Sequence, residues 1–149
     1  MIDSLIFQTN WGLKKLYTTP SNSVVTMTRT ELDCIMDLNL FEDLLMIKKF
    51  VDDVKSAFNI KPVAERGNFC NSLVAHALGI AHKNETIELS TPADWLKLAE
   101  KKILSIYYTN DIRNTIVDYA KQNGYNVSTY LGKPIIKLSK IFVLLDRIK

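Results

Sequence analysis

The sequence is poor in the residues that build metal centres and disulfide frameworks. Its 149 residues include two cysteines, Cys34 and Cys70, and two histidines, His76 and His82. No CxxC motif and no Cys/His cluster occurs, so no zinc site is expected. The five glycines are not clustered, which excludes a phosphate-binding loop of the P-loop type. We therefore expect no metal and no cofactor.

Long hydrophobic runs are also missing. No apolar run approaches the roughly 20 residues that cross a bilayer, and residues 1–4 lack the basic start of a signal peptide. These absences predict a cytoplasmic protein without membrane contact, in which both thiols stay reduced. Cys34, in an apolar context, is expected in the core. The small size and the Asn-, Lys- and Ile-rich composition would suit a phage or viral protein, in the host cytoplasm or the virion.

What the chain does have is an ordinary globular composition with uneven charge. Apolar residues make up 47% and charged residues 23%, which is typical of one soluble domain with its own core. Residues 1–96 carry 9 basic and 12 acidic side chains, a balance of −3, whereas residues 97–149 carry 10 and 4, a balance of +6. The basic third predicts either a surface for phosphate or an acidic partner, or a solvated lysine-rich surface.

In the N-terminal part of the chain, local patterns predict strands. Short apolar runs at residues 5–7 and 13–17 indicate two strands joined by a turn at Asn10-Trp11-Gly12. Residues 24–27 indicate a third strand. A helical turn over residues 31–36 follows, capped by Thr28 or Thr30.

Helices dominate the middle of the chain. The 3.6-residue period predicts a long helix over about 40–58, with its acidic pairs on a solvated face. A helix opening at Cys70 ends near Gly79. A further helix, capped by Thr91, runs to about Lys102.

The basic third alternates strand and helix. It is predicted to contain a strand at 103–108, a helix at about 111–122, a hairpin of 125–130 with 134–138, and a final segment at 141–148 that fits a strand or a helix.

Cys70 lies in the stretch Gly67-Asn68-Phe69-Cys70-Asn71-Ser72-Leu73-Val74, where a glycine-containing loop leads into an apolar helix. A thiol at a helix N-terminus feels the positive end of the helix dipole, which favours the reactive thiolate. Cysteine catalysis also needs a base, usually histidine. His76 follows Cys70 by six residues, so on one helix the two side chains diverge. His82 lies in a loop that can fold back and is the weaker, remaining candidate base.

Four features occur in one order: the Asn10-Trp11-Gly12 strand pair, the long helix, Phe69-Cys70-Asn71-Ser72-Leu73-Val74, and Ser90-Thr91-Pro92-Ala93-Asp94-Trp95. In these features the chain resembles the permuted papain-like amidases, relatives of the NlpC-type cell-wall peptidases. The resemblance covers about 95 residues. It implies Cys70 as nucleophile, and it implies a catalytic histidine upstream of it, where this sequence has none.

The resemblance and the patterns together predict an α+β fold. Residues 1–96 would form a reduced papain-like core, a small antiparallel sheet packed on helices with a cysteine at a helix N-terminus. Residues 97–149 would form a basic α/β extension packed on the same unit. The first functional hypothesis is a catalytically degenerate binding or structural module with a protein partner or an oligomeric state.

Two alternatives stay open. One is an active cysteine amidase, esterase or acyltransferase that uses Cys70, with His82 as a possible base. The other is nucleic-acid binding, because a helix followed by a lysine-bearing hairpin with interleaved tyrosines is found in some nucleic-acid binders. The residues of that predicted surface are Lys121, Lys133, Lys137, Lys140, Tyr125 and Tyr130.

Overall fold

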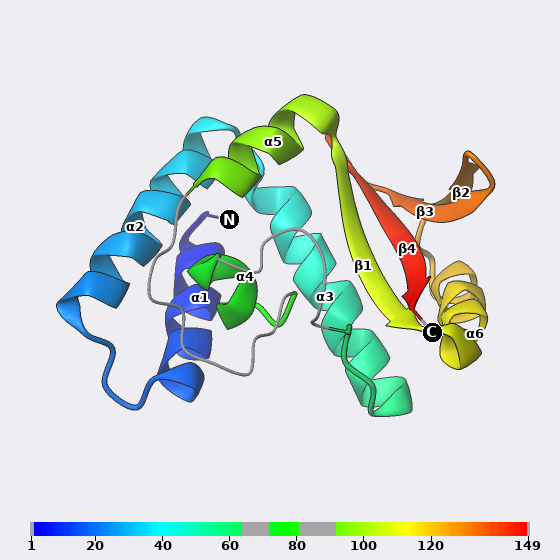
Figure 1. The fold of residues 1–149 in the computed structure, drawn as a ribbon, viewed down its shortest axis with the longest axis horizontal. Helices are drawn as coiled ribbons and strands as arrows, with labels where there is room; N and C mark the ends of the chain where they lie inside the picture. The colour runs from blue at the N-terminus through cyan, green and yellow to red at the C-terminus, as the bar shows by residue number, and fades with distance from the viewer. Residues whose placement is uncertain (1, 64–71, 81–91, 149) are drawn as a thin grey trace.

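The structure is a computed structural model that describes residues 2–63, 72–80 and 92–148. These residues form an α+β fold in which helices occupy the N-terminal part and a four-stranded sheet the C-terminal part (Figure 1). The helices are α1 (Ile2–Leu16), α2 (Asn22–Asp37), α3 (Phe41–Phe58), α4 (Leu73–Ala77), α5 (Ala93–Lys101) and α6 (Asn110–Gln122). The strands are β1 (Ile103–Thr109), β2 (Val127–Tyr130), β3 (Lys133–Lys137) and β4 (Phe142–Ile148).

The predicted strand pair at the N-terminus is wrong, because residues 2–16 form helix α1. Leu5, Thr9 and Leu13 are buried at four-residue spacing, the period of one helix face. Gly12 is a helix residue and makes no turn. A Cβ built on Gly12 would lie 1.9 Å from the carbonyl oxygen of Ala77 in α4. The glycine therefore permits a close helix–helix crossing, a role that the local sequence does not reveal.

The predicted strand at 24–27 is also wrong, since it lies inside α2. All four strands lie in residues 103–148, so the small antiparallel sheet predicted for residues 1–96 is not found among the described residues of that range. Ser21 caps this helix by accepting a hydrogen bond from the Val24 N–H at 3.2 Å. Thr28 and Thr30 are not caps; each hydroxyl donates to the carbonyl four residues earlier in the helix. The β-branched run favours a strand locally, but burial of one face of α2 decides for a helix.

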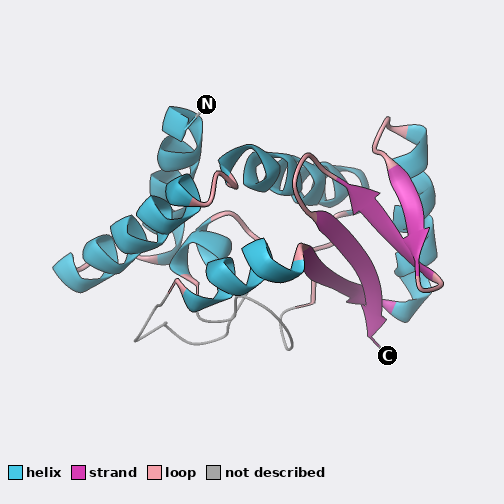
Figure 2. Ribbon diagram, turned by 90° about the horizontal axis from the view of Figure 1, so that it is seen from above, coloured by secondary structure: helices cyan, strands magenta, loops and turns pink. Residues whose placement is uncertain are grey.

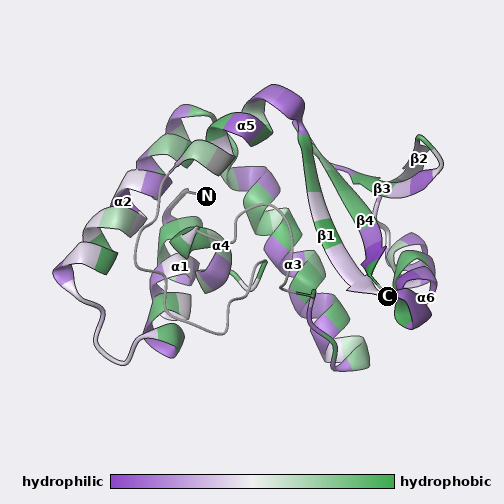
Figure 3. Ribbon diagram, in the orientation of Figure 1, coloured by the Kyte–Doolittle hydropathy of each residue, from purple (hydrophilic) through white to green (hydrophobic). Residues whose placement is uncertain are grey.

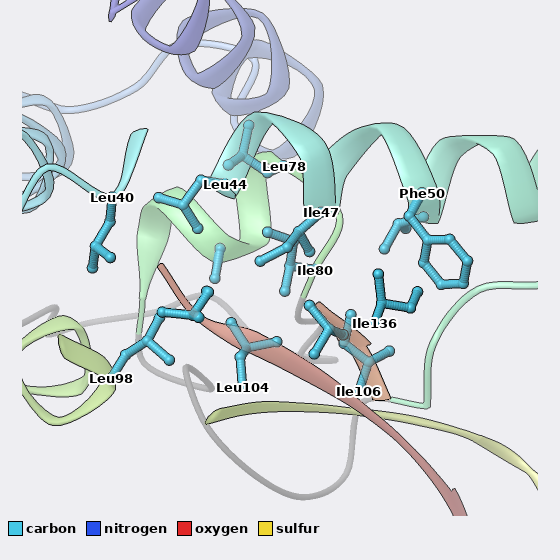
Figure 4. Close-up of a cluster of buried hydrophobic side chains, with 14 of the residues drawn as sticks. Leu40, Leu44, Ile47, Phe50, Leu78, Ile80, Leu98, Leu104, Ile106 and Ile136 are labelled. Atoms are coloured by element: carbon cyan, nitrogen blue, oxygen red, sulfur yellow. The ribbon is translucent and has the colours of Figure 1, made fainter. Parts of the chain in front are cut away.

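The long helix α3 confirms its prediction and lies between helices α1, α2 and α4 on one side and the sheet on the other (Figure 1). Its buried residues include Leu44, Ile47 and Phe50, which Figure 4 shows packed toward Leu104, Ile106 and Ile136 of the sheet. α3 ends at Asn59, whose φ of 57° closes the helix in the left-handed region.

The sheet confirms the strand at 103–108 and the hairpin, and the last segment proves to be strand β4. The strand order is β1-β4-β3-β2, with β1 and β4 parallel and the other two pairs antiparallel. Helix α6, also predicted, packs near α3: the rings of Phe58 and Tyr119 meet edge-on at 5.4 Å. The Arg113 guanidinium donates to the Leu145 carbonyl at 2.9 Å. Figure 3 shows hydrophobic residues in the first parts of β1 and β4, and both hydrophobic and hydrophilic residues on α6.

The sheet therefore has two unlike faces. The first face packs on α3 and α6, while no described helix lies over the second (Figure 2). Side chains alternate along a strand, so the neighbours of Leu104, Ile106 and Ile136 point to the second face.

Candidate functional site

Helix α4 is the described part of the segment that carries the papain-like resemblance. It begins at Leu73 and not at Cys70, so the predicted start of the helix is wrong. Ser72 is the N-cap: its backbone is extended, and its hydroxyl accepts a hydrogen bond from the Ala75 N–H at 3.0 Å. The helix ends before Gly79, at φ 77°, as the sequence predicts. His76 is buried, with 8% of its surface exposed. Cys70, His82 and Thr91 lie outside the described residues.

The start of α4 is held by a buried carboxylate that the sequence analysis did not identify. Glu31 of α2 is fully buried. It accepts hydrogen bonds from the Ser72 hydroxyl, from the Leu73 N–H at 2.8 Å and from the Trp95 indole N–H at 2.9 Å. We call Glu31, Ser72, Leu73 and Trp95 the Glu31 cluster. It joins α2, α4 and α5 through one side chain.

The chemistry of the Glu31 cluster is that of a satisfied buried acid. Both carboxylate oxygens accept hydrogen bonds from neutral donors, the arrangement that makes a buried carboxylate tolerable. The N–H of Leu73, the first residue of α4, is directed at this carboxylate. The positive end of the α4 dipole is thus already compensated by protein.

The second candidate is the second face of the sheet, where the strand register sets polar and aromatic side chains in rows. One row aligns Tyr107 with Asp146, and Lys133 with Tyr130. Lys133 Nζ lies 3.2 Å from a carboxylate oxygen of Asp146, which joins the two pairs. Tyr130 is 44% exposed and Tyr107 is half-buried.

A second row lies at the end of the sheet where β1 begins. Ile103, Phe142 and Lys137 are aligned there, and the Phe142 N–H donates to the Lys102 carbonyl at 2.8 Å. Phe142 is half-buried, whereas Lys102 and Lys137 are exposed. Exposed Lys140 follows in the turn before β4.

The six predicted nucleic-acid-binding residues do not form one surface. Lys133, Lys137 and Tyr130 lie on the second face. Lys121 lines a groove of about 460 Å³ between α6 and the β2–β3 hairpin, and Tyr125 packs on Phe50 of α3, with the ring centres 5.1 Å apart. Sequence reasoning missed Tyr107 and Phe142, which the two-residue alternation of their strands would have placed beside the lysines.

Neither a protein-family model nor a curated protein sequence matches this chain. Within the described residues, no three His, Cys, Asp or Glu side chains are grouped to hold a metal ion. No helix in the described ranges is long and apolar enough to cross a membrane.

Proposed function

We propose that the protein is a non-catalytic binding and assembly module, a degenerate relative of the permuted papain-like amidases. The Glu31 cluster is the observation that carries this proposal. It places a fully buried carboxylate at the start of the helix that follows Cys70 in sequence.

A papain-like nucleophile depends on free hydrogen-bond donors and on a positive electrostatic potential at the start of its helix. The thiolate is favoured by the helix dipole, and the oxyanion of an acyl intermediate needs hydrogen-bond donors that no protein group already occupies. Here the Leu73 N–H and the Ser72 hydroxyl donate to Glu31 instead. Both histidines of the sequence, His76 and His82, follow Cys70.

The alternative, an acyl-cysteine enzyme, is tested by trapping. Wild type and Cys70→Ser are incubated with an activated ester, and intact mass is measured over time. We expect slow acylation at the same rate in both proteins, because surface amines react in each. A rapid stoichiometric adduct that only wild type forms would overturn the non-catalytic proposal and favour a cysteine amidase, esterase or acyltransferase.

A second candidate function is single-stranded nucleic-acid binding on the second face of the sheet. Aromatic side chains that stack with bases, next to lysines that contact phosphates, are the usual components of such a surface. Tyr107, Tyr130 and Phe142 supply the rings, and Lys137 and Lys140 the exposed cations. Residues 1–96 have a net charge of −3, so the positive charge of the protein is concentrated in residues 97–149, which contain the sheet.

Fluorescence anisotropy with a labelled single-stranded oligonucleotide tests this candidate. At low salt we expect binding that Lys137→Glu weakens about tenfold or more, because the reversal replaces a phosphate contact by a repulsion. Lys121→Glu is the matched control, since it makes the same charge change on the α6 side of the sheet. An equal loss of affinity in both variants would indicate that the oligonucleotide is attracted by the net charge of the protein, and would contradict a defined binding surface.

A further inference from the structure

Helix α1 carries an exposed row of side chains that the fold does not use. Asp3, Phe7, Trp11 and Lys15 follow one another at four-residue spacing, and we call them the α1 stripe. Phe7 is 68% exposed and Trp11 is 58% exposed. Their rings stack with centroids 6.5 Å apart, and Lys15 Nζ lies 5.6 Å from the Trp11 ring centre.

The opposite face of α1 supplies its packing. Leu5, Thr9 and Leu13 are buried, and Gly12 lies against α4. The α1 stripe is therefore free for a partner. Single exposed apolar residues are common on monomers, but a stacked Phe–Trp pair is a contiguous patch of the composition that interfaces favour.

The order of charges on the stripe indicates which partner fits. It begins with an acid, Asp3, and ends with a base, Lys15, with the two aromatic rings between them. A second copy of the same helix, running antiparallel about an axis midway between Phe7 and Trp11, sets Phe7 against the partner's Trp11. The same axis sets Asp3 against the partner's Lys15, and both contacts occur twice because a two-fold interface is self-complementary.

Helix packing rules allow this arrangement. Residues four apart form a ridge, and ridges of this class interdigitate when two helices cross at about −50°. From Asp3 to Lys15 the stripe extends about 18 Å along the helix at ~1.5 Å per residue. A contact of this length is expected to bury less than the roughly 1,200 Å² of standard interfaces, so the expected dimer is weak and reversible, with a dissociation constant in the micromolar range.

We propose that the α1 stripe pairs two copies of this chain as an antiparallel homodimer. This pairing gives the assembly role of the proposed function a surface and a partner, and it rests on that function only to this extent. The state of Cys70 does not enter the argument, so failure of the dimer leaves the non-catalytic proposal standing, and an acyl adduct on Cys70 leaves the dimer standing.

Sedimentation velocity of the full chain tests the pairing at low salt, from about 1 to about 200 µM protein. Wild type is expected to shift from monomer to dimer over this range. Trp11→Ala should raise the dissociation constant at least tenfold, because it removes the central ring. Leu131→Ala is the matched control: Leu131 is 85% exposed, in the β2–β3 turn, and its loss should leave the dimer unchanged.

Charge reversal distinguishes the proposed pairing from nonspecific association. Asp3→Lys alone and Lys15→Asp alone should each weaken the dimer, since each creates a like-charge contact. The double variant Asp3→Lys/Lys15→Asp should restore it. Both reversed charges oppose the α1 dipole, so recovery cannot come from a more stable helix. A wild type that stays monomeric, a dimer indifferent to Trp11→Ala, or a double variant no better than the singles would overturn the proposal. Circular dichroism checks the fold of each variant.

Discussion

The helical part and the sheet part of this molecule are held together in different ways. Helices α1, α2, α4 and α5 meet at two points where little can change: the contact of Gly12 with Ala77, and the Glu31 cluster. The sheet is built from regular strand pairing and an apolar first face on α3 and α6. Asp43 of α3 fastens the two parts, because its carboxylate accepts hydrogen bonds from three backbone N–H groups, those of residues 139–141.

Because of this difference, the two parts are expected to differ in their sensitivity to substitution. The stability of a strand pair comes from many hydrogen bonds and side-chain contacts, so one substitution there lowers the free energy of unfolding only a little. A buried carboxylate with several donors is more sensitive, since its loss leaves several polar atoms unpaired.

Replacing Glu31 by alanine is expected to have the largest effect. The substitution strands the Ser72 hydroxyl, the Leu73 N–H and the Trp95 indole N–H, all of which are buried. We expect the free energy of unfolding to fall by about 4 kcal/mol, measured by urea unfolding. Glu42→Ala, on the exposed side of α3, should cost almost nothing. A loss below about 1 kcal/mol for Glu31→Ala would contradict the structural role of the cluster.

Gly12→Ala comes next. In an open helix this change would stabilise by about 1 kcal/mol, because alanine is the better helix former. Here the new Cβ would meet the Ala77 carbonyl, so α1 and α4 must separate. We expect a net loss of about 3 kcal/mol, seen as a lowered Tm. Asn10→Ala, exposed on the same helix, should be neutral or slightly stabilising.

Asp43→Ala tests the junction of the two parts. Three backbone N–H groups of the turn before β4 lose their acceptor, and that of Ile141 is buried. Water can replace the acceptor for the two others, so the expected loss is about 2 kcal/mol. Hydrogen exchange should show increased opening of residues 139–141. Unchanged protection there would show that strand pairing alone holds the turn.

Tyr125→Phe has the smallest effect and depends on pH. The Tyr125 hydroxyl donates to Asp53 at 2.7 Å, beside Lys49. Burial, and then this hydrogen bond, raise the pKa of Tyr125 to about 12. The hydrogen bond from Tyr125, and then that from Lys49, lower the pKa of Asp53. At neutral pH the variant should lose about 1 kcal/mol.

The sign of the pH dependence follows from these shifts. A raised tyrosine pKa stabilises the fold below about pH 10, the ordinary value, and the contribution disappears as the pH rises through about 12. A lowered aspartate pKa stabilises the fold above about pH 4 and is lost in acid. The difference between wild type and Tyr125→Phe should therefore shrink at both ends. In the variant, the phenolate absorbance should lack one of the components that titrate at high pH. The component of Tyr108, whose pKa is also raised by burial, should remain.

The two parts also differ in what the sequence could predict. α3, α6 and the β2–β3 hairpin were predictable because their local period, caps and turn residues agree with the tertiary environment. In α1 and α2 the short apolar runs suit strand or helix equally, and Gly12 resembles a turn residue until α4 is seen against it. The choice there is made by packing between segments distant in sequence, which no local pattern records.

The candidate site was predictable to a smaller degree. Alternation along β1 and β4 was available in the sequence, so Tyr107 and Phe142 could have been placed beside the lysines. The role of Glu31 could not be predicted. A glutamate inside a helical pattern gives no sign that its carboxylate is buried, or that it binds the Ser72 hydroxyl, 41 residues later in the sequence. Buried polar groups of this kind become visible only through their partners.

The rate of alkylation of Cys70 against pH tests the central claim most directly. Cys34→Ser gives the Cys70 profile alone, and Cys70→Ser gives the reference profile of Cys34, whose pKa is raised by burial and then by the nearby charges of Asp37 and Glu31. For a non-catalytic module we expect a Cys70 midpoint at or above the free-thiol value of about 8.5. A midpoint well below that value would show an activated thiolate and contradict the non-catalytic module.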